Sequence, residues 1–156
     1  MSEQYQFAAD TGKILDIVID SLYSQKEIFL RELVSNASDA ISKRQFASLQ
    51  GTAAGSFDGM ISIAVDKKAK RFTITDNGIG LNDKDLKNTL GTIASSGTKS
   101  FLEQIEQSSD KSNSQSQLIG QFGVGFYAAF MVAERVEVLS KKLDSDKAFC
   151  LSLIHI

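Results

Sequence analysis

The sequence predicts one domain of the α/β (α+β) class. Apolar residues recur at helical spacing in much of the first fifty residues, whereas two later runs alternate between apolar and polar side chains. A chain of 156 residues has the size of one ordinary domain. With 42% hydrophobic and 23% charged residues, its composition is that of a globular protein with one core.

The first fifty residues predict two helices. Ile14 and Ile17 recur at helical spacing after a polar start, which predicts a helix from about Thr11 to Ser24. A second helix is predicted to begin near Gln25. The chain therefore opens with two helices in succession.

The second predicted helix has two distinct faces. Glu32, Asn36 and Asp39, spaced i, i+4 and i+7, share one narrow stripe, so their side chains stand in a row along the helix. The apolar residues gather on another side of the helical wheel: Leu30, Leu33, Val34, Ala37, Ala40 and Ile41.

A β-hairpin is predicted after the Gly-rich break GTAAGSFDG. The alternating runs MISIAV and RFTITD are joined by the basic turn DKKAK. Phe72, Ile74 and Asp76 have the same parity, so Asp76 is expected to point inward if the other two face the core. A buried carboxylate needs a partner, because burying it unpaired would cost several kcal/mol.

The second half of the chain predicts shorter elements. Leu86 to Leu90 is expected to form a short helix, and the polar tract from Glu106 to Gln117 is expected to be mobile or loosely helical. The segment LIGQFGVGFYAAFMVAERVEVLSKK then predicts a glycine-rich loop, a short apolar helix and an alternating strand through Val136 and Val138.

Composition excludes several classes of function. The formal net charge of -2 and the pI near 5.4 argue against a general nucleic-acid or membrane-binding surface. No secretory signal and no apolar run long enough to span a membrane is visible, so we expect a cytoplasmic location. One cysteine and one histidine leave no cluster for a typical zinc site and argue against a Ser-His-Asp triad.

The row of Glu32, Asn36 and Asp39 has two interpretations. Taken alone it is best explained as the solvent side of an amphipathic helix. Alternatively, a carboxylate can orient and deprotonate a water molecule while an amide oxygen coordinates a hard cation. The second interpretation requires ligands from other elements.

The turn that begins at Asp76 is also ambiguous. Asp, Asn and Gly are the ordinary residues of a hairpin exit, so the bland interpretation of Asp76, Gly78 and Gly80 is a turn. The functional one is a carboxylate that accepts a hydrogen bond from the amino group of a base, with glycines allowing a ligand ring to approach the backbone.

Two further segments could contact phosphate. Gly120, Gly123 and Gly125 precede a predicted helix and could offer backbone N–H groups to an anion, although this is not the P-loop pattern and a plain glycine-rich loop explains it too. The run SSGTKS, which includes Thr98, could donate to phosphate or be a flexible turn. The polar tract between these segments lies where a lid would be placed.

Four motifs in this order resemble the N-terminal ATP-binding domain of the ninety-kilodalton heat-shock chaperone family, most of all its bacterial form: RELVSNASDA, DNGIGL, GTIASSGTKSF and GQFGVGFYAAFMVA. The resemblance runs from about Tyr5 to Phe149. It implies a two-layer sandwich of helices on a mixed, largely antiparallel sheet, the histidine-kinase, gyrase and heat-shock chaperone type of ATPase fold.

The resemblance also implies a role for each matching residue. Glu32 would activate the attacking water, Asn36 would bind Mg²⁺, and Asp76 would accept from the adenine amino group. Asp39 would lie beside Glu32 and Asn36 as a supporting polar group, Gly80 would lie close to the adenine ring, and Thr98 would help to organise the site. The backbone of a phosphate loop would wrap the phosphates: Gln121, Gly123, Val124, Gly125 and Phe126.

The implied function is an ATP-binding, slowly ATP-hydrolysing domain of a heat-shock chaperone, with ATP or ADP and Mg²⁺ as cofactors. Its implied partners are unfolded client proteins and, in the full-length protein, a second copy. We expect residues 1–156 to be a C-terminally truncated domain with a lid at about 91–125, and the tail 151–156 to be non-native. The alternatives are a fragment unable to bind nucleotide and a kinase or topoisomerase module of the same fold.

Overall fold

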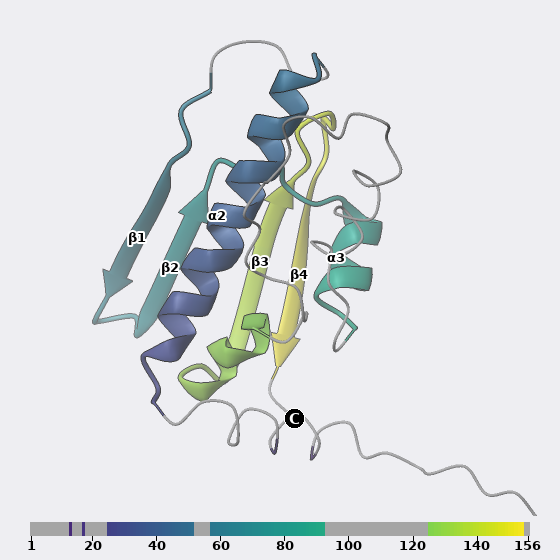
Figure 1. The fold of residues 1–156 in the computed structure, drawn as a ribbon. Helices are drawn as coiled ribbons and strands as arrows, with labels where there is room; N and C mark the ends of the chain where they lie inside the picture. Colours follow the sequence, from purple (N-terminus) through teal and green to yellow (C-terminus); the bar gives the residue numbers. More distant parts are fainter. Residues whose placement is uncertain (1–12, 14–16, 18–24, 52–56, 93–124, 155–156) are drawn as a thin grey trace, which may run out of the picture.

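The computed structural model describes residues 13, 17, 25–51, 57–92 and 125–154. Its elements, shown in Figure 1, are the helices α2 (Ile28–Leu49) and α3 (Asp83–Thr89), the 3-10 helix η1 (Gly125–Met131), and the strands β1 (Ile61–Asp66), β2 (Arg71–Asp76), β3 (Arg135–Lys141) and β4 (Ala148–Ile154). Lys13 and Ile17 are helical, and the rest of the first predicted helix lies outside the described residues. The predicted class of helices with antiparallel strands is confirmed.

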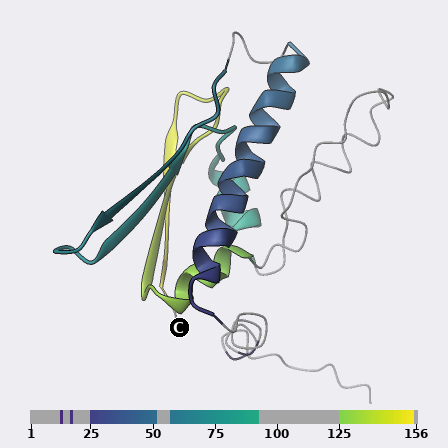
Figure 2. The same cartoon turned by 60° about the vertical axis from the view of Figure 1, so that its left-hand side comes forward.

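The strands form two antiparallel hairpins. β1 pairs with β2 so that Ile63 lies opposite Ile74, and β3 pairs with β4 so that Val138 lies opposite Leu151. Among the described residues, each hairpin is a separate two-stranded sheet. Figure 2 shows both hairpins on one side of α2 and α3, which gives the two layers that the resemblance implied.

The long helix α2 packs against the first hairpin and η1. It contacts both strands of the first hairpin as well as η1, and the Phe29 ring meets the Phe72 ring edge to face at 5.4 Å. On its predicted apolar side, Ala37 is buried, whereas Leu30 is 36% exposed. The helix ends where Gly51 adopts a φ of +73°, a left-handed conformation that glycine reaches without steric strain.

Helix α3 begins three residues before the predicted start at Leu86, because its first turn is capped. The Asn82 side chain accepts from the Asp85 backbone N–H at 2.8 Å, and the Asp85 carboxylate accepts from the Asn82 N–H at 3.3 Å. This reciprocal pair is a capping box, which satisfies two backbone donors at the helix start. Leu86 is 2% exposed and anchors the helix in the core.

The second hairpin extends to the end of the described chain. β3 and β4 both alternate between exposed and half-buried residues, the pattern of strands that cover a core with one face. β4 was not predicted, and it includes residues 151–154, the start of the tail that the sequence led us to expect to be non-native. No helix of the described residues combines the length and apolar character needed to cross a membrane.

Candidate functional site

The polar row on α2 is not a uniform solvent face. The Glu32 side chain is 26% exposed, Asn36 is exposed, and Asp39 is only 4% exposed. A purely solvated face would leave all three accessible, so burial of Asp39 counts against the bland interpretation of the row.

The Glu32 carboxylate lies against the start of η1. A Cβ atom added to Gly125 would overlap Oε2 of Glu32 and lie 3.3 Å from its Cδ. The backbone at the start of η1 therefore approaches this carboxylate closely, and a side chain at Gly125 would require the Glu32 carboxylate to move. Arg31 also approaches Glu32, with Nη2 3.7 Å from Oε1, but the Arg31 side chain is 75% exposed and the pair is weak.

One turn after Asp39, α2 carries a half-buried lysine. Burial lowers the pKa of Lys43, and the negative charge of Asp39 partly opposes this change. The i, i+4 spacing places the two charged groups on the same side of the helix. The inner end of the row is therefore a carboxylate with a cation beside it.

The prediction that Asp76 points inward is wrong. Phe72 and Ile74 are half-buried as expected, but Asp76 is exposed. The strand ends at Asp76, and its Oδ1 turns to accept the backbone N–H of Gly78 at 2.8 Å. Strand parity no longer controls the side chain at this point, because the chain has already entered a turn stabilised by the aspartate itself.

The turn after Asp76 is fastened to α2. The N–H of Ile79 donates to the carbonyl of Ala40 at 3.0 Å, and a Cβ on Gly78 would lie 2.7 Å from the Ala40 carbonyl oxygen. Arg44 on the same helix donates to the carbonyl of Asn77. The Asp76 turn is thus held at the part of α2 that directly follows Asp39.

Asn77 ties the same turn to the chain before β1. Its Oδ1 accepts from the Met60 N–H at 2.7 Å, and its Nδ2 donates to the carbonyl of Asp58 at 2.8 Å. The Asn77 backbone N–H also donates to the Met60 carbonyl at 3.3 Å. These bonds fix the strand end from which the Asp76 carboxylate projects.

The Gly80 backbone lies against the end of β3 in the second hairpin. Its φ is +69°, and a Cβ at this position would overlap the carbonyl oxygen of Lys141. The structure thus explains this glycine by the backbone approach of β3. Its predicted closeness to a ligand ring stays a prediction.

Together these contacts place the polar groups in sequence along one helix. Gly125 and Glu32 lie at one end, Asn36 follows, and the Asp76 turn meets the helix at Ala40. From residue 32 to residue 40 the helix rises about 12 Å. The candidate site therefore extends along α2 from the Glu32 carboxylate to the turn that carries the Asp76 carboxylate.

Beside the Glu32 end, η1 supplies buried residues. Tyr127, Ala128 and Ala129 are buried, and the Tyr127 hydroxyl donates to the Leu90 carbonyl at 2.7 Å. The Phe126 ring packs edge to face against the Tyr127 ring at 5.5 Å. The other predicted site residues lie outside the described part of the chain: Thr98, Gln121, Gly123 and Val124.

The donor set fits a magnesium nucleotide better than a metal held by the protein alone. Within the part of the chain that the structure describes, no three His, Cys, Asp or Glu side chains form a metal-binding group. Mg²⁺ is typically held by one or two protein ligands together with substrate phosphates. The exposed amide of Asn36, one turn from Glu32, suits that mode of binding.

Sequence reasoning missed several residues that build this site. Lys43 and Arg44 follow Asp39 and Ala40 by one helical turn, and that i, i+4 spacing was a readable signal. Ser140 accepts a hydrogen bond from the backbone N–H of Leu81 at 2.8 Å. The two residues are 59 positions apart, so local patterns do not indicate the pair.

The chain is similar to several bacterial proteins named Chaperone protein HtpG. The protein of Campylobacter jejuni subsp. doylei is 55% identical over 149 residues, covering 94% of this chain and 24% of the relative. That of Helicobacter hepaticus is 54% identical over 151 residues, covering 96% and 24%. That of Roseobacter denitrificans is 53% identical over 154 residues, covering 97% and 24%. The chain thus spans about a quarter of the length of these curated relatives.

A family model supports the same relationship and confirms the resemblance found in the sequence. The model described as Histidine kinase-, DNA gyrase B-, and HSP90-like ATPase matches residues 23–155, which include every element from α2 to β4. The chain therefore belongs to the histidine kinase-, DNA gyrase B- and HSP90-like ATPase family.

Proposed function

We propose that this chain binds ATP or ADP with Mg²⁺ along α2 and hydrolyses ATP slowly as part of a molecular chaperone. The observation that carries the proposal is the order of groups on the helix, from Glu32 with Gly125, through Asn36, to the Asp76 turn at Ala40. An extended nucleotide needs a base acceptor at one end and groups for metal and phosphate at the other. The row supplies them in that order.

At the base end, Asp76 is the group that recognises adenine. Its carboxylate is exposed, and the bond from the Gly78 N–H to Oδ1 fixes its orientation. A carboxylate held in this way accepts a hydrogen bond from the exocyclic amino group of adenine. Asp39 lies on the same helix as Glu32 and Asn36 and supports them as a polar group, and Gly80 is the residue that we place near the ring.

At the phosphate end, Asn36 is the protein ligand of Mg²⁺ and Glu32 is the base. Bound magnesium supplies charge neutralisation for the phosphates. The carboxylate of Glu32 orients a water molecule and accepts its proton, which is the part of phosphoryl transfer that a side chain must perform. We assign the phosphates to the backbone of Gly125 and Phe126, and to the residues outside the described part: Thr98, Gln121, Gly123 and Val124.

The role of the whole protein is supported by the names of its relatives. The three relatives are each called Chaperone protein HtpG. We propose that the full-length protein acts on unfolded or partly folded clients in the cytoplasm as a homodimer. We also propose that residues of about 91–125 form a lid over the nucleotide.

Two matched variants test the nucleotide site. Asp76→Asn removes the carboxylate that accepts from adenine, whereas Asp66→Asn makes the same change at the other end of the first hairpin. Asp66 also accepts a hydrogen bond two residues ahead, from the Lys68 N–H at 2.9 Å, so the local chemistry is matched. Calorimetric titration with MgADP should show binding lost in Asp76→Asn and kept in Asp66→Asn.

Two results would count against the proposed nucleotide site. If both variants bind MgADP with the affinity of the wild-type chain, Asp76 is not the adenine acceptor and the assignment of the row fails. A wild-type chain that unfolds cooperatively but binds no nucleotide would favour the alternative of a binding-incompetent fragment.

A further inference from the structure

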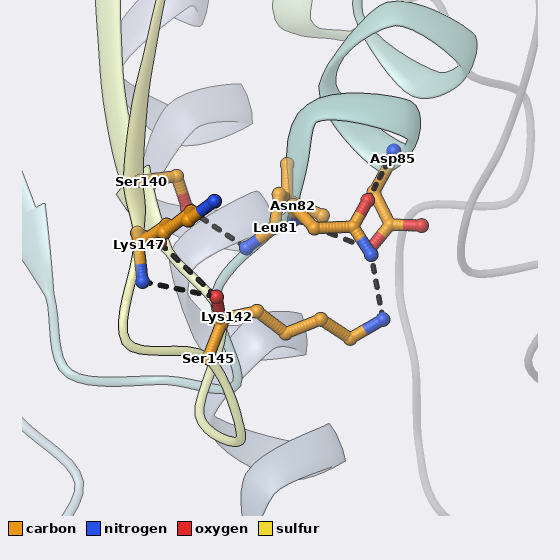
Figure 3. A network of polar contacts seen from close by, with 7 residues as sticks. All are labelled: Leu81, Asn82, Asp85, Ser140, Lys142, Ser145 and Lys147. Atoms are coloured by element: carbon orange, nitrogen blue, oxygen red, sulfur yellow. Dashed lines mark hydrogen bonds and ion pairs between the residues drawn. The ribbon is translucent and has the colours of Figure 1, made fainter.

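The second hairpin contacts the Asp76 turn at three consecutive residues. The N–H of Leu143 donates to the Ile79 carbonyl at 2.9 Å, and the Leu81 N–H donates to Ser140 Oγ at 2.8 Å. Between them, the Gly80 backbone lies against the Lys141 carbonyl. Ser140 and Leu81 face each other in Figure 3. The hairpin thus contacts residues 79–81 of the turn, whereas α2 contacts residues 77–79.

Of these contacts, the one from Ser140 depends on the identity of a side chain. Its position in β3 makes it unusual, because Val136, Val138 and Ser140 are the half-buried residues of that strand. A valine at the third position would continue the apolar face. Serine there instead supplies an acceptor for a backbone N–H that a hydrophobic residue would leave unsatisfied.

The bond to Leu81 fixes the far end of the segment that starts at Asp76. Leu81 directly precedes Asn82, the N-cap of α3. The same hairpin also holds the first turn of α3, because Lys142 Nζ lies 2.9 Å from the Asp85 carboxylate that completes the capping box (Figure 3). The chain from Asp76 to Asn82 is therefore held by α2 near its start and by the hairpin at its end.

We propose that Ser140 is a positioning residue for adenine recognition, acting through Leu81 and the turn on the carboxylate of Asp76. This inference rests on the proposed function, because it concerns how the same site selects its base. Ser140 itself does not touch the nucleotide. Its hydroxyl holds the turn in the geometry in which Asp76 can accept from an amino group.

A test must separate positioning from general stability. Inosine diphosphate carries an oxo acceptor at C6, where adenine carries its amino donor, and an N–H at N1, where adenine has an acceptor, so the two bases present opposite hydrogen-bonding patterns on the edge that Asp76 recognises. The ratio of the two dissociation constants, for magnesium IDP and magnesium ADP, therefore measures how well this edge of the base is recognised. A variant that is merely less stable loses affinity for both nucleotides equally and leaves the ratio unchanged.

Three variants make the test specific. Ser140→Ala removes the acceptor of the Leu81 N–H, and Ser140→Thr keeps a hydroxyl at the same place. Ser145→Ala is the matched control: Ser145 lies in the turn of the same hairpin, and its hydroxyl pairs with the Lys147 backbone at 3.2 and 3.3 Å rather than with Leu81 (Figure 3).

We expect Ser140→Ala to lower the preference for ADP over IDP by about twofold to tenfold, the range that one hydrogen bond contributes to an equilibrium constant. Ser140→Thr should restore most of the preference, and Ser145→Ala should leave it unchanged. A preference kept in full by Ser140→Ala would overturn the role of Ser140. If the wild-type chain itself shows no preference for ADP, the proposed function fails at the Asp76 contact, and the inference with it.

Discussion

Replacing Gly80 with alanine should be far more damaging than the same change at Gly51. Both residues have a left-handed φ, +69° and +73°, so both variants incur the cost of placing an L side chain there, roughly 1 to 2 kcal/mol. At Gly51 a Cβ would meet nothing within 4 Å. Gly51→Ala therefore measures the conformational term alone.

Gly80→Ala adds a steric term. The new Cβ would overlap the Lys141 carbonyl oxygen and lie 2.7 Å from the Lys141 carbonyl carbon and 3.1 Å from the Lys142 Cα. These are backbone atoms of a paired strand end, which cannot rotate away, and forced overlap of this kind typically costs about 1 to 3 kcal/mol. The total for Gly80→Ala is thus about 2 to 5 kcal/mol.

Urea unfolding of the two variants, extrapolated linearly to water, measures both free energies of unfolding. The effect of alanine on the unfolded chain is the same in both and cancels in the comparison. The predicted outcome is that Gly80→Ala is less stable than Gly51→Ala by at least about 1 kcal/mol. Equal destabilisation would refute the close approach of β3 to Gly80.

Two further predictions concern α2. Glu32→Ala should keep MgADP binding but abolish ATP turnover in a steady-state phosphate-release assay, because it removes the base and spares the Asp76 turn; turnover at the wild-type rate would show that another group is the base. Burial lowers the pKa of Lys43, so its ammonium group loses a proton at a lower pH in the folded chain than in the unfolded chain. The free-energy cost of burying the charged ammonium group therefore disappears as the pH rises toward 10.5, the ordinary pKa of lysine. Urea titrations should therefore show that the wild-type chain gains free energy of unfolding relative to the Lys43→Met variant between neutral pH and pH 10.5. If the difference in free energy between the two chains does not change with pH, the assigned burial of Lys43 is wrong.

Regular patterns predicted the elements that depend on local sequence. The apolar periodicity of α2 and the alternation of the first hairpin were sufficient to predict these elements, although in this hairpin only β2 half-buries alternate residues, Phe72 and Ile74, whereas β1 is exposed after Ile61. Glu32, Asn36 and Asp39 were correctly placed in a row on one helix. The start of α3 was placed three residues late although its capping box, Asn82 and Asp85, was present in the sequence.

Contacts between distant segments could not be predicted in this way. The exposure of Asp76 depends on a turn that captures its own side chain, which strand parity does not describe. Asp39 is buried although a polar stripe normally faces water, because tertiary packing covers that part of α2. The bond from Leu81 to Ser140 joins positions 59 residues apart, and only the folded chain reveals it.

The most direct test of the central claim is calorimetric titration of this chain with MgADP. The arrangement along α2 predicts saturable heat at one nucleotide per chain, with the signal abolished when Asp76 is replaced by asparagine. A chain that unfolds cooperatively yet gives no binding heat, or that binds equally well without the Asp76 carboxylate, would contradict the claim that these groups form an adenine-nucleotide site.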